Sequence, residues 1–135
     1  MNREEIKKIL PHREPMLLID EVEKQGDYSI GRYTVRGDEW FLQGHFPGHP
    51  IVPGVILCEM MAQSCCLLLQ DIINERLTLL LKMDNVKIRE SVNPSETVEF
   101  KCELINSKDP YYFAKAIAYK NNKVCASGEF TFALK

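Results

Sequence analysis

The chain has 135 residues, of which 45% are hydrophobic, a length that allows one domain with a full core and is too short for two ordinary domains. Its 17 basic side chains face 19 acidic ones, so the net charge is -2 and the broad positive field that draws proteins to nucleic acid is absent. We therefore expect a single domain, residues 1–135, that does not bind nucleic acid.

The N-terminus is charged, MNREE, and no apolar stretch of signal-peptide length follows it. The longest apolar segment, residues 55–73, is interrupted by five polar residues that include Glu59 and Gln63, whereas a membrane span needs roughly 20 predominantly apolar residues. The five cysteines include no CxxC pair and lie among apolar residues, as expected of reduced side chains in a core. We expect a cytoplasmic protein that does not enter a membrane.

The first third of the chain predicts a short helix, a strand hairpin and a loop. Asn2 followed by Glu5 has the spacing of a helix start, and Pro11 ends the helix. Residues 16–22 and 29–35 are rich in aliphatic and β-branched side chains and flank a polar turn at residues 25–27, which predicts paired strands. An ordered loop is expected over residues 40–53, which are too rich in glycine and proline for a helix or a central strand.

The rest of the chain predicts one long helix and four strands. Apolar residues occupy nearly every face of a helix over residues 54–74, which is typical of a helix surrounded by other structure. Alternating or β-rich patterns predict strands at residues 79–89, 98–105, 111–119 and 123–134. Together the elements predict an α+β domain in which an antiparallel sheet wraps around a central helix, the hot-dog fold. Because a monomer would leave a sheet edge and half of this helix apolar and uncovered, we expect at least a dimer formed along an edge strand.

The candidate chemistry lies in residues 44–54, GHFPGHPIVPG, and in the helix that follows. A histidine side chain can accept a proton in general base catalysis, so His45 is a candidate base. Glu59 lies in the apolar stretch ILCEMM, where burial should raise its pKa and allow it to give a proton to a leaving hydroxyl. The helix begins at Gly54 with free amides that can bind an oxyanion. A base, an acid and an oxyanion donor are what the removal of water from a 3-hydroxyacyl thioester requires.

Each of these residues also has a simpler interpretation. His45 can be a loop histidine bonded to backbone, and Glu59 can pair with an arginine or lie in a dimer interface. Gln63, one helical turn beyond Glu59, is either a hydrogen-bond partner of that carboxyl or a polar interface residue. His12 is expected to stabilise the N-terminal turn and to take no part in chemistry.

Metal binding is the sharpest competing chemistry, because His45 and His49 are four residues apart and Cys58 and Glu59 follow. Two prolines and a glycine between the histidines exclude a regular helix there, and Cys58 and Glu59 point about 100° apart on the next helix. We therefore expect no metal ion. Cys58 lacks an evident base and is not expected to be a nucleophile.

Three segments together resemble the FabZ-type 3-hydroxyacyl-[acyl-carrier-protein] dehydratases of type II fatty acid synthesis. Residues 10–20, LPHREPMLLID, are similar to the family's opening P-H-R-x-P-x-L-L-x-D, and residues 44–54 are similar to its loop G-H-F-P-x-x-P-x-x-P-G. Residues 59–63, EMMAQ, resemble its E-x-M-A-Q signature. The resemblance implies that His45 is the catalytic histidine, Glu59 the catalytic acid and Gly54 the backbone donor to the thioester carbonyl.

The resemblance also implies an assembly and a partner. His45 and Glu59 of one site would come from different subunits, the acyl chain would occupy a tunnel at the dimer interface, three dimers would form a hexamer, and no cofactor would be used. We expect Phe46, Pro53 and Val55 to line that tunnel. Because the acyl carrier proteins of this pathway are acidic, we expect a small basic docking rim, formed by Lys82, Lys87 and Arg89.

Two departures and two competing functions accompany this resemblance. Residues 92–96, VNPSE, stand where the family usually has V-x-P-G-D, and His49 stands where Asn is frequent. The related FabA-type enzymes, which also isomerise the double bond, carry Asp where this chain has Glu59, so the sequence favours dehydration without isomerisation. The competing functions are a hot-dog acyl thioesterase and a non-catalytic hot-dog subunit that binds acyl carrier protein.

Overall fold

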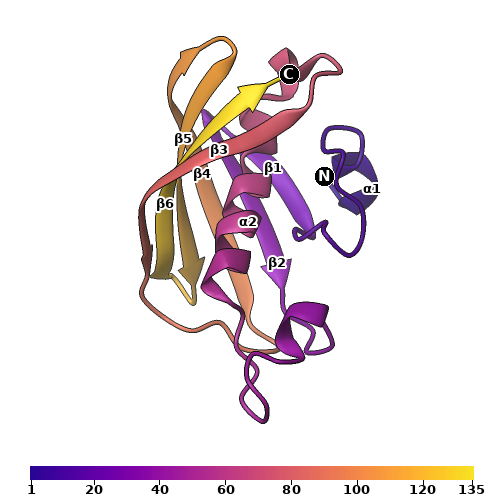
Figure 1. Cartoon of the computed structure of the whole chain (residues 1–135), viewed down its shortest axis with the longest axis vertical. Helices are drawn as coiled ribbons and strands as arrows, with labels where there is room; N and C mark the ends of the chain where they lie inside the picture. Colours follow the sequence, from indigo (N-terminus) through magenta and orange to yellow (C-terminus); the bar gives the residue numbers. More distant parts are fainter.

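A six-stranded antiparallel sheet wraps around the helix α2 (Gly54–Ser64) in the computed structural model, which describes residues 1–135 (Figure 1). The strand order is β1 (Glu21–Gln25), β2 (Tyr28–Thr34), β4 (Thr97–Lys108), β5 (Tyr111–Lys120), β6 (Lys123–Leu134) and β3 (Thr78–Ile88). The two edges are therefore β1 and β3, and β3 pairs with β6 alone. This architecture confirms the predicted α+β class and the hot-dog fold.

The core lies between α2 and the concave face of the sheet. Successive side chains of a strand point to opposite faces, and on β5 the inward positions are the buried residues Ala114, Ala116 and Ala118. These small side chains leave room for the helix, whose buried Met60 and Met61 belong to the same apolar cluster. The alternation along the late strands is thus what places α2 at the centre of the domain.

The helix lies closest to the sheet where Ser64 packs against Gly31 of β2. A Cβ atom at Gly31 would overlap the Ser64 side chain, so only glycine fits at this crossing. Ser29 donates a hydrogen bond of 2.6 Å to the backbone carbonyl of Ser64. That carbonyl is thereby withdrawn from the helical hydrogen-bond ladder, and α2 ends at this residue.

The predicted single helix over residues 54–74 is therefore wrong beyond Ser64. A 3-10 turn, η2 (Cys66–Leu68), and a short helix, α3 (Gln70–Ile73), replace its second half. None of the helices has the length and the apolar character that a membrane span requires.

The N-terminal segment lies beside β1 (Figure 1) and packs in a small apolar cluster of its own with Val22 of β1 and with Cys66 and Leu67 of η2. The predicted cap is confirmed, because the side chains of Asn2 and Glu5 each accept the other residue's backbone N–H, but α1 (Arg3–Ile6) ends well before Pro11. The predicted strand over residues 16–22 is wrong for residues 16–20, because β1 begins at Glu21 and continues to Gln25. The amide of Leu18 there donates to the side chain of Gln63 at 2.8 Å instead of to a neighbouring strand.

Two turns adopt the left-handed backbone region that favours glycine or asparagine. Asn121 and Asn122, with φ of 52° and 63°, form the predicted two-residue turn between β5 and β6. Ser95 has φ of 72° at the position where the resembling family has glycine. Ser95 therefore carries the strain that a side chain brings to this backbone region.

The glycine-rich and proline-rich loop extends beyond the lower ends of the strands, between the 3-10 turn η1 (Trp40–Leu42) and α2 (Figure 1). Its backbone is nevertheless ordered by internal bonds, since Ile51 donates to the carbonyl of His45 at 2.9 Å and Val52 donates to that of Val92 at 2.9 Å. The loop therefore presents its side chains from a rigid frame outside the main body of the sheet.

We predict that Gly31→Ala lowers the free energy of unfolding by about 1–3 kcal/mol, because the added methyl group overlaps Ser64 and forces α2 away from the sheet. Chemical denaturation measures this loss. Gly44→Ala is the matched control, since a Cβ atom there meets nothing within 4 Å. Equal stability of the two variants would contradict the proposed close approach.

Candidate active site

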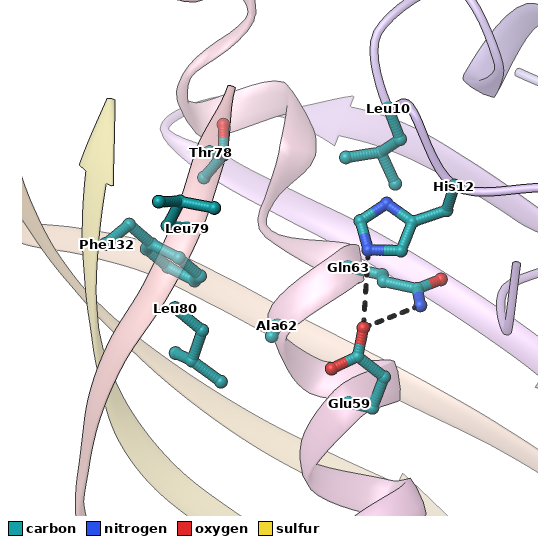
Figure 2. A pocket seen from close by; sticks show the side chains of 9 residues that line it. All are labelled: Leu10, His12, Glu59, Ala62, Gln63, Thr78, Leu79, Leu80 and Phe132. Carbon is teal, nitrogen blue, oxygen red and sulfur yellow. Dashed lines mark hydrogen bonds and ion pairs between the residues drawn. The ribbon is translucent and has the colours of Figure 1, made fainter. Parts of the chain in front are cut away.

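Glu59 faces a cavity of about 220 Å³ between α2, β3 and the N-terminal segment (Figure 2). The apolar part of its wall comes from separate elements: Leu10, Ala62, Leu79, Leu80 and Phe132. The side chain of Glu59 is 26% exposed, so its carboxyl is partly covered and still reachable from solvent. The cavity therefore combines one accessible carboxyl group with an aliphatic and aromatic wall.

The carboxyl of Glu59 is held through one of its two oxygens. The Gln63 side-chain amide donates to Oε1 at 2.9 Å, and Nε2 of His12 lies 3.4 Å from the same oxygen (Figure 2). The buried Gln63 is itself oriented by the N-terminal segment, because it donates to the carbonyl of Met16 at 2.7 Å and accepts from the amide of Leu18. Oε2 of Glu59 has no hydrogen-bond partner in the chain and remains free to meet a ligand.

The pKa of Glu59 results from opposing influences. Burial raises the pKa of this carboxyl, but the contacts with His12 and Gln63 lower it and together outweigh burial, so the pKa lies below the ordinary glutamate value. The sequence-based expectation of a raised pKa is therefore wrong for the single chain. The neighbours of Glu59 along the helix are apolar, but the folded chain brings His12 of the N-terminal segment and Gln63 of the next helical turn to Oε1.

His45 lies in the loop before α2 and not in the Glu59 cavity. Its Nδ1 is 2.9 Å from the carbonyl oxygen of Ile51, and its ring stacks on Phe46 with the centroids 4.1 Å apart. A carbonyl oxygen only accepts, so Nδ1 carries the proton and Nε2, which has no partner in the chain, presents a lone pair. The geometry leaves this ring able to accept a proton but does not place it beside Glu59 of the same chain.

Gly54 is the first residue of α2, and its amide donates no hydrogen bond. A Cβ atom there would lie 3.3 Å from the Ile88 side chain, so glycine lets this side chain pack closely against the start of α2. Of the residues expected to line an acyl tunnel, Val55 is 72% exposed, Phe46 is 53% exposed and Pro53 is half-buried. None of the three lines the Glu59 cavity of the single chain, so their role stays a prediction that involves a second chain.

The three basic residues expected at a docking rim are all exposed, at β3 or just beyond its end. Lys87 and Arg89 line a polar groove together with Lys115, a further basic residue that sequence reasoning did not include. Lys82 lies outside that groove, and its ammonium group is 3.5 Å from the carboxylate of Asp84. The groove thus gathers Lys87 and Arg89 but not Lys82.

His12 is the site residue whose position the sequence reasoning missed. It was expected only to stabilise the N-terminal turn, yet its imidazole points at Glu59 (Figure 2). Arg13 shapes this turn by donating to the carbonyls of Leu10 at 3.0 Å and of His12 at 2.7 Å. The available signal was the LPHR segment itself, which belongs to the family's opening motif.

The alternative chemistries receive no support from the geometry. No three histidine, cysteine, aspartate or glutamate side chains are grouped so that they could hold a metal ion. Burial raises the pKa of the Cys58 thiol, which disfavours the thiolate that a nucleophile requires.

Comparisons with known proteins agree on one family. Residues 10–129 match the FabA-like domain. The chain is 37% identical to "3-hydroxyacyl-[acyl-carrier-protein] dehydratase FabZ" of Clostridium perfringens (strain SM101 / Type A), over 99% of both chains. It is 39% identical to the protein of the same name from Latilactobacillus sakei subsp. sakei (strain 23K), over 100% of this chain and 99% of the other. Among solved structures, the dehydratase heterocomplex ApeI:P from Xenorhabdus doucetiae matches with a TM-score of 0.82 and 20% identity, over 96% of this chain and 90% of that one.

We predict that Gln63→Met lowers the free energy of unfolding by about 3 kcal/mol, because the similar-sized thioether leaves the amide of Leu18 and the carbonyl of Met16 without partners. Urea denaturation at neutral pH measures the change. Gln70→Met, at an exposed position, is the matched control and should leave stability within about 0.5 kcal/mol. A similar small effect in both variants would show that the Gln63 contacts contribute little.

Proposed function

Because this chain belongs to the FabA-like domain family, we propose that it is a 3-hydroxyacyl-[acyl-carrier-protein] dehydratase in which Glu59 acts together with His45 of a second chain. The observation that carries the proposal is the complementary state of the two groups. Glu59 offers an unbonded Oε2 inside an apolar cavity, and His45 offers an unbonded Nε2 on a loop outside it. Within a single chain, the Glu59 cavity therefore holds the proposed acid but not the proposed base, and a second chain can supply His45.

The reaction follows from these groups. The thioester carbonyl accepts a hydrogen bond from the free amide of Gly54 at the start of α2, which stabilises negative charge developing on that oxygen. Nε2 of His45 removes a proton from C2, and the electron pair of that C–H bond forms the C2–C3 double bond. The C3–O bond breaks, and the departing hydroxyl takes the proton of Glu59 to leave as water. Transfer of the proton from His45 back to Glu59 restores both groups.

Glu59 must be protonated to donate, and the occupied site favours that state. In the single chain water still reaches the carboxyl, and the contacts with His12 and Gln63 keep the pKa below its ordinary value. An acyl chain that fills the cavity removes this water and strengthens burial, which is the largest single influence on the group and raises the pKa. Substrate binding therefore shifts the acid toward its donating form.

A second copy of the chain bound along β3 supplies the missing wall and the missing histidine. The outer edge of β3 has no hydrogen-bonded neighbour, and an open apolar edge of this length favours pairing. The strand exposes a row of aliphatic side chains: Leu79, Leu80, Leu81, Met83, Val86 and Ile88. Since Leu79 and Leu80 also line the Glu59 cavity, pairing at this edge closes the cavity as it forms the dimer. Three such dimers would form the hexamer that the family resemblance implies.

Cysteine placement supports the expected cytoplasmic location. All five cysteines are free and buried, so they pack as small apolar side chains and need no oxidising compartment.

We predict that the purified protein converts a 3-hydroxyacyl thioester to the enoyl thioester, and that His45→Ala and Glu59→Gln each abolish this activity. Mixing equal amounts of the two inactive variants under conditions that exchange subunits should restore about a quarter of the wild-type rate. About half of the dimers are then mixed, and one of the two sites in each mixed dimer holds both intact groups. Enoyl absorbance measures the rate, and sedimentation measures the dimer. No recovery in mixed dimers would rule out a site shared between chains.

The same assay separates the competing functions. Free thiol released without enoyl product would identify a thioesterase, and the absence of both products would indicate a non-catalytic subunit.

We further predict that the double variant Lys87→Glu/Arg89→Glu raises KM for the substrate on acyl carrier protein about fivefold, because the polar groove then repels an acidic partner. KM for the same acyl group on a short pantetheine-like thiol should not change. Lys24→Glu, exposed on the opposite edge strand, is the matched control. Lys82→Glu should have the smaller effect, since Lys82 lies outside the groove. An unchanged KM for the carrier-bound substrate would exclude this docking surface.

A further inference from the structure

We propose that His12 is a positioning residue for the catalytic acid: with Gln63, it holds Glu59 by Oε1 so that the donated proton resides on Oε2. The inference rests on the proposed role of Glu59 and adds a residue of the N-terminal segment to that site. His12 is distant from Glu59 in sequence and reaches it only in the folded chain (Figure 2).

The two oxygens of the Glu59 carboxyl have different surroundings. Nε2 of Gln63, at 2.9 Å, and Nε2 of His12, at 3.4 Å, both approach Oε1, and nothing in the chain approaches Oε2. A protonated carboxyl has one oxygen that accepts and one that carries the proton. The hydrogen bond from Gln63 and the nearby imidazole nitrogen of His12 both favour Oε1 as the acceptor, so the proton is placed on Oε2.

The surroundings of the His12 ring determine its tautomer. Its Nδ1 is buried and has no hydrogen-bond partner. A proton on Nδ1 would bury an N–H without an acceptor, which is costly, whereas an unprotonated Nδ1 loses only a weak acceptor contact. The ring therefore carries its proton on Nε2, the nitrogen that faces Glu59. At 3.4 Å the two groups are in contact without the geometry of a hydrogen bond, and polar contacts at a catalytic group often tighten when substrate binds.

The N-terminal turn around His12 is closed by hydrogen bonds from Arg13, which hold the imidazole ring in place. Besides its bonds to the carbonyls of Leu10 and His12, Arg13 donates to the carbonyl of Lys7 at 3.3 Å, which closes the turn around its own guanidinium group. Leu10 is buried in the N-terminal cluster. The acid is thereby held from two independent elements, α2 through Gln63 and the N-terminal turn through His12.

The electrostatic environment of the acid within the chain is simple. Among the residues that line the cavity, His12 and Glu59 are the only ones with titratable side chains. The proposal adds only His45 of the second chain to this set. Removal of His12 therefore has one direct electrostatic consequence, the loss of a contact that stabilises the ionised carboxyl of Glu59.

The test compares three substitutions at this position. His12→Ala removes the ring, His12→Phe keeps a ring of similar size without a donor, and His12→Gln places an amide N–H at the same number of bonds from the backbone as Nε2. Lys8→Ala is the matched control, because Lys8 is an exposed residue of the same segment whose side chain makes no hydrogen bond. The readouts are the titration of the Glu59 carboxyl by carbon-13 NMR, kcat and KM on a short thioester, and the thermal midpoint.

We expect His12→Ala and His12→Phe to raise the pKa of Glu59, because a contact that lowers it is lost, and to reduce kcat about tenfold with KM within about twofold. His12→Gln should return both the pKa and kcat toward the wild-type values, and Lys8→Ala should change neither. The Phe variant keeps the test valid if the Ala variant does not fold.

Three results would overturn the inference: an unchanged Glu59 titration in the Ala and Phe variants, a shifted titration with unchanged kcat, or a loss of kcat that follows the thermal midpoint and is not restored by Gln. Failure of the proposed function is distinguishable from these. If Glu59→Gln retains full dehydratase activity, Glu59 is not the acid, whatever the His12 variants do to its titration.

Discussion

The side-chain amide of Gln63 connects the three parts of the molecule on which the candidate site depends. It lies buried on α2, bonds the backbone of the N-terminal segment at Met16 and Leu18, and donates its remaining hydrogen to Glu59. Because an amide offers a fixed set of two donors and one acceptor oxygen, all three contacts form only when helix, segment and carboxyl have one mutual arrangement. A buried network satisfied in this way specifies a unique packing, and here the same packing orients the carboxyl.

This arrangement depends in turn on how closely α2 approaches the sheet. The alanines of β5 and the contact between Gly31 and Ser64 allow the helix to lie deep in the curved sheet, so that only one side of it stays uncovered. Glu59 lies toward that side, at the boundary between the core and the cavity. A carboxyl at this boundary is dry enough to be influenced by burial and open enough to meet a substrate. The fold, together with the N-terminal turn that carries His12, thus produces the environment of the Glu59 carboxyl.

The proposed base, His45, is positioned in a different way from the proposed acid, Glu59. His45 owes its orientation to the loop backbone, through its bond to Ile51, and this loop extends beyond the sheet (Figure 1). Loops that a rigid scaffold positions are common carriers of functional side chains. In the proposed dimer, an acid built into one chain meets a base presented by the other. Activity would then require assembly, and the monomer would hold two incomplete halves of different sites.

Much of the architecture was determined by the sequence alone, because it is encoded locally. The alternation of the late strands, the paired asparagines at residues 121 and 122 and the helix start at Gly54 each reflect short-range rules of backbone geometry and burial. The motif-bearing segments likewise identified His45, Glu59 and Gln63 as the residues to consider, before their arrangement was known.

The remaining features were decided by the tertiary structure, because they depend on contacts between residues distant in sequence. Helix α2 ends at Ser64 because a hydroxyl from β2 bonds its carbonyl, and the first predicted strand is shortened because a helix side chain bonds its amide at Leu18. The pKa of Glu59 is lowered and not raised because His12 and Gln63 both meet Oε1. No local pattern contains these pairings, since a polar group takes whichever partner the folded chain brings within reach, and only the fold brings the N-terminal turn to the carboxyl of Glu59.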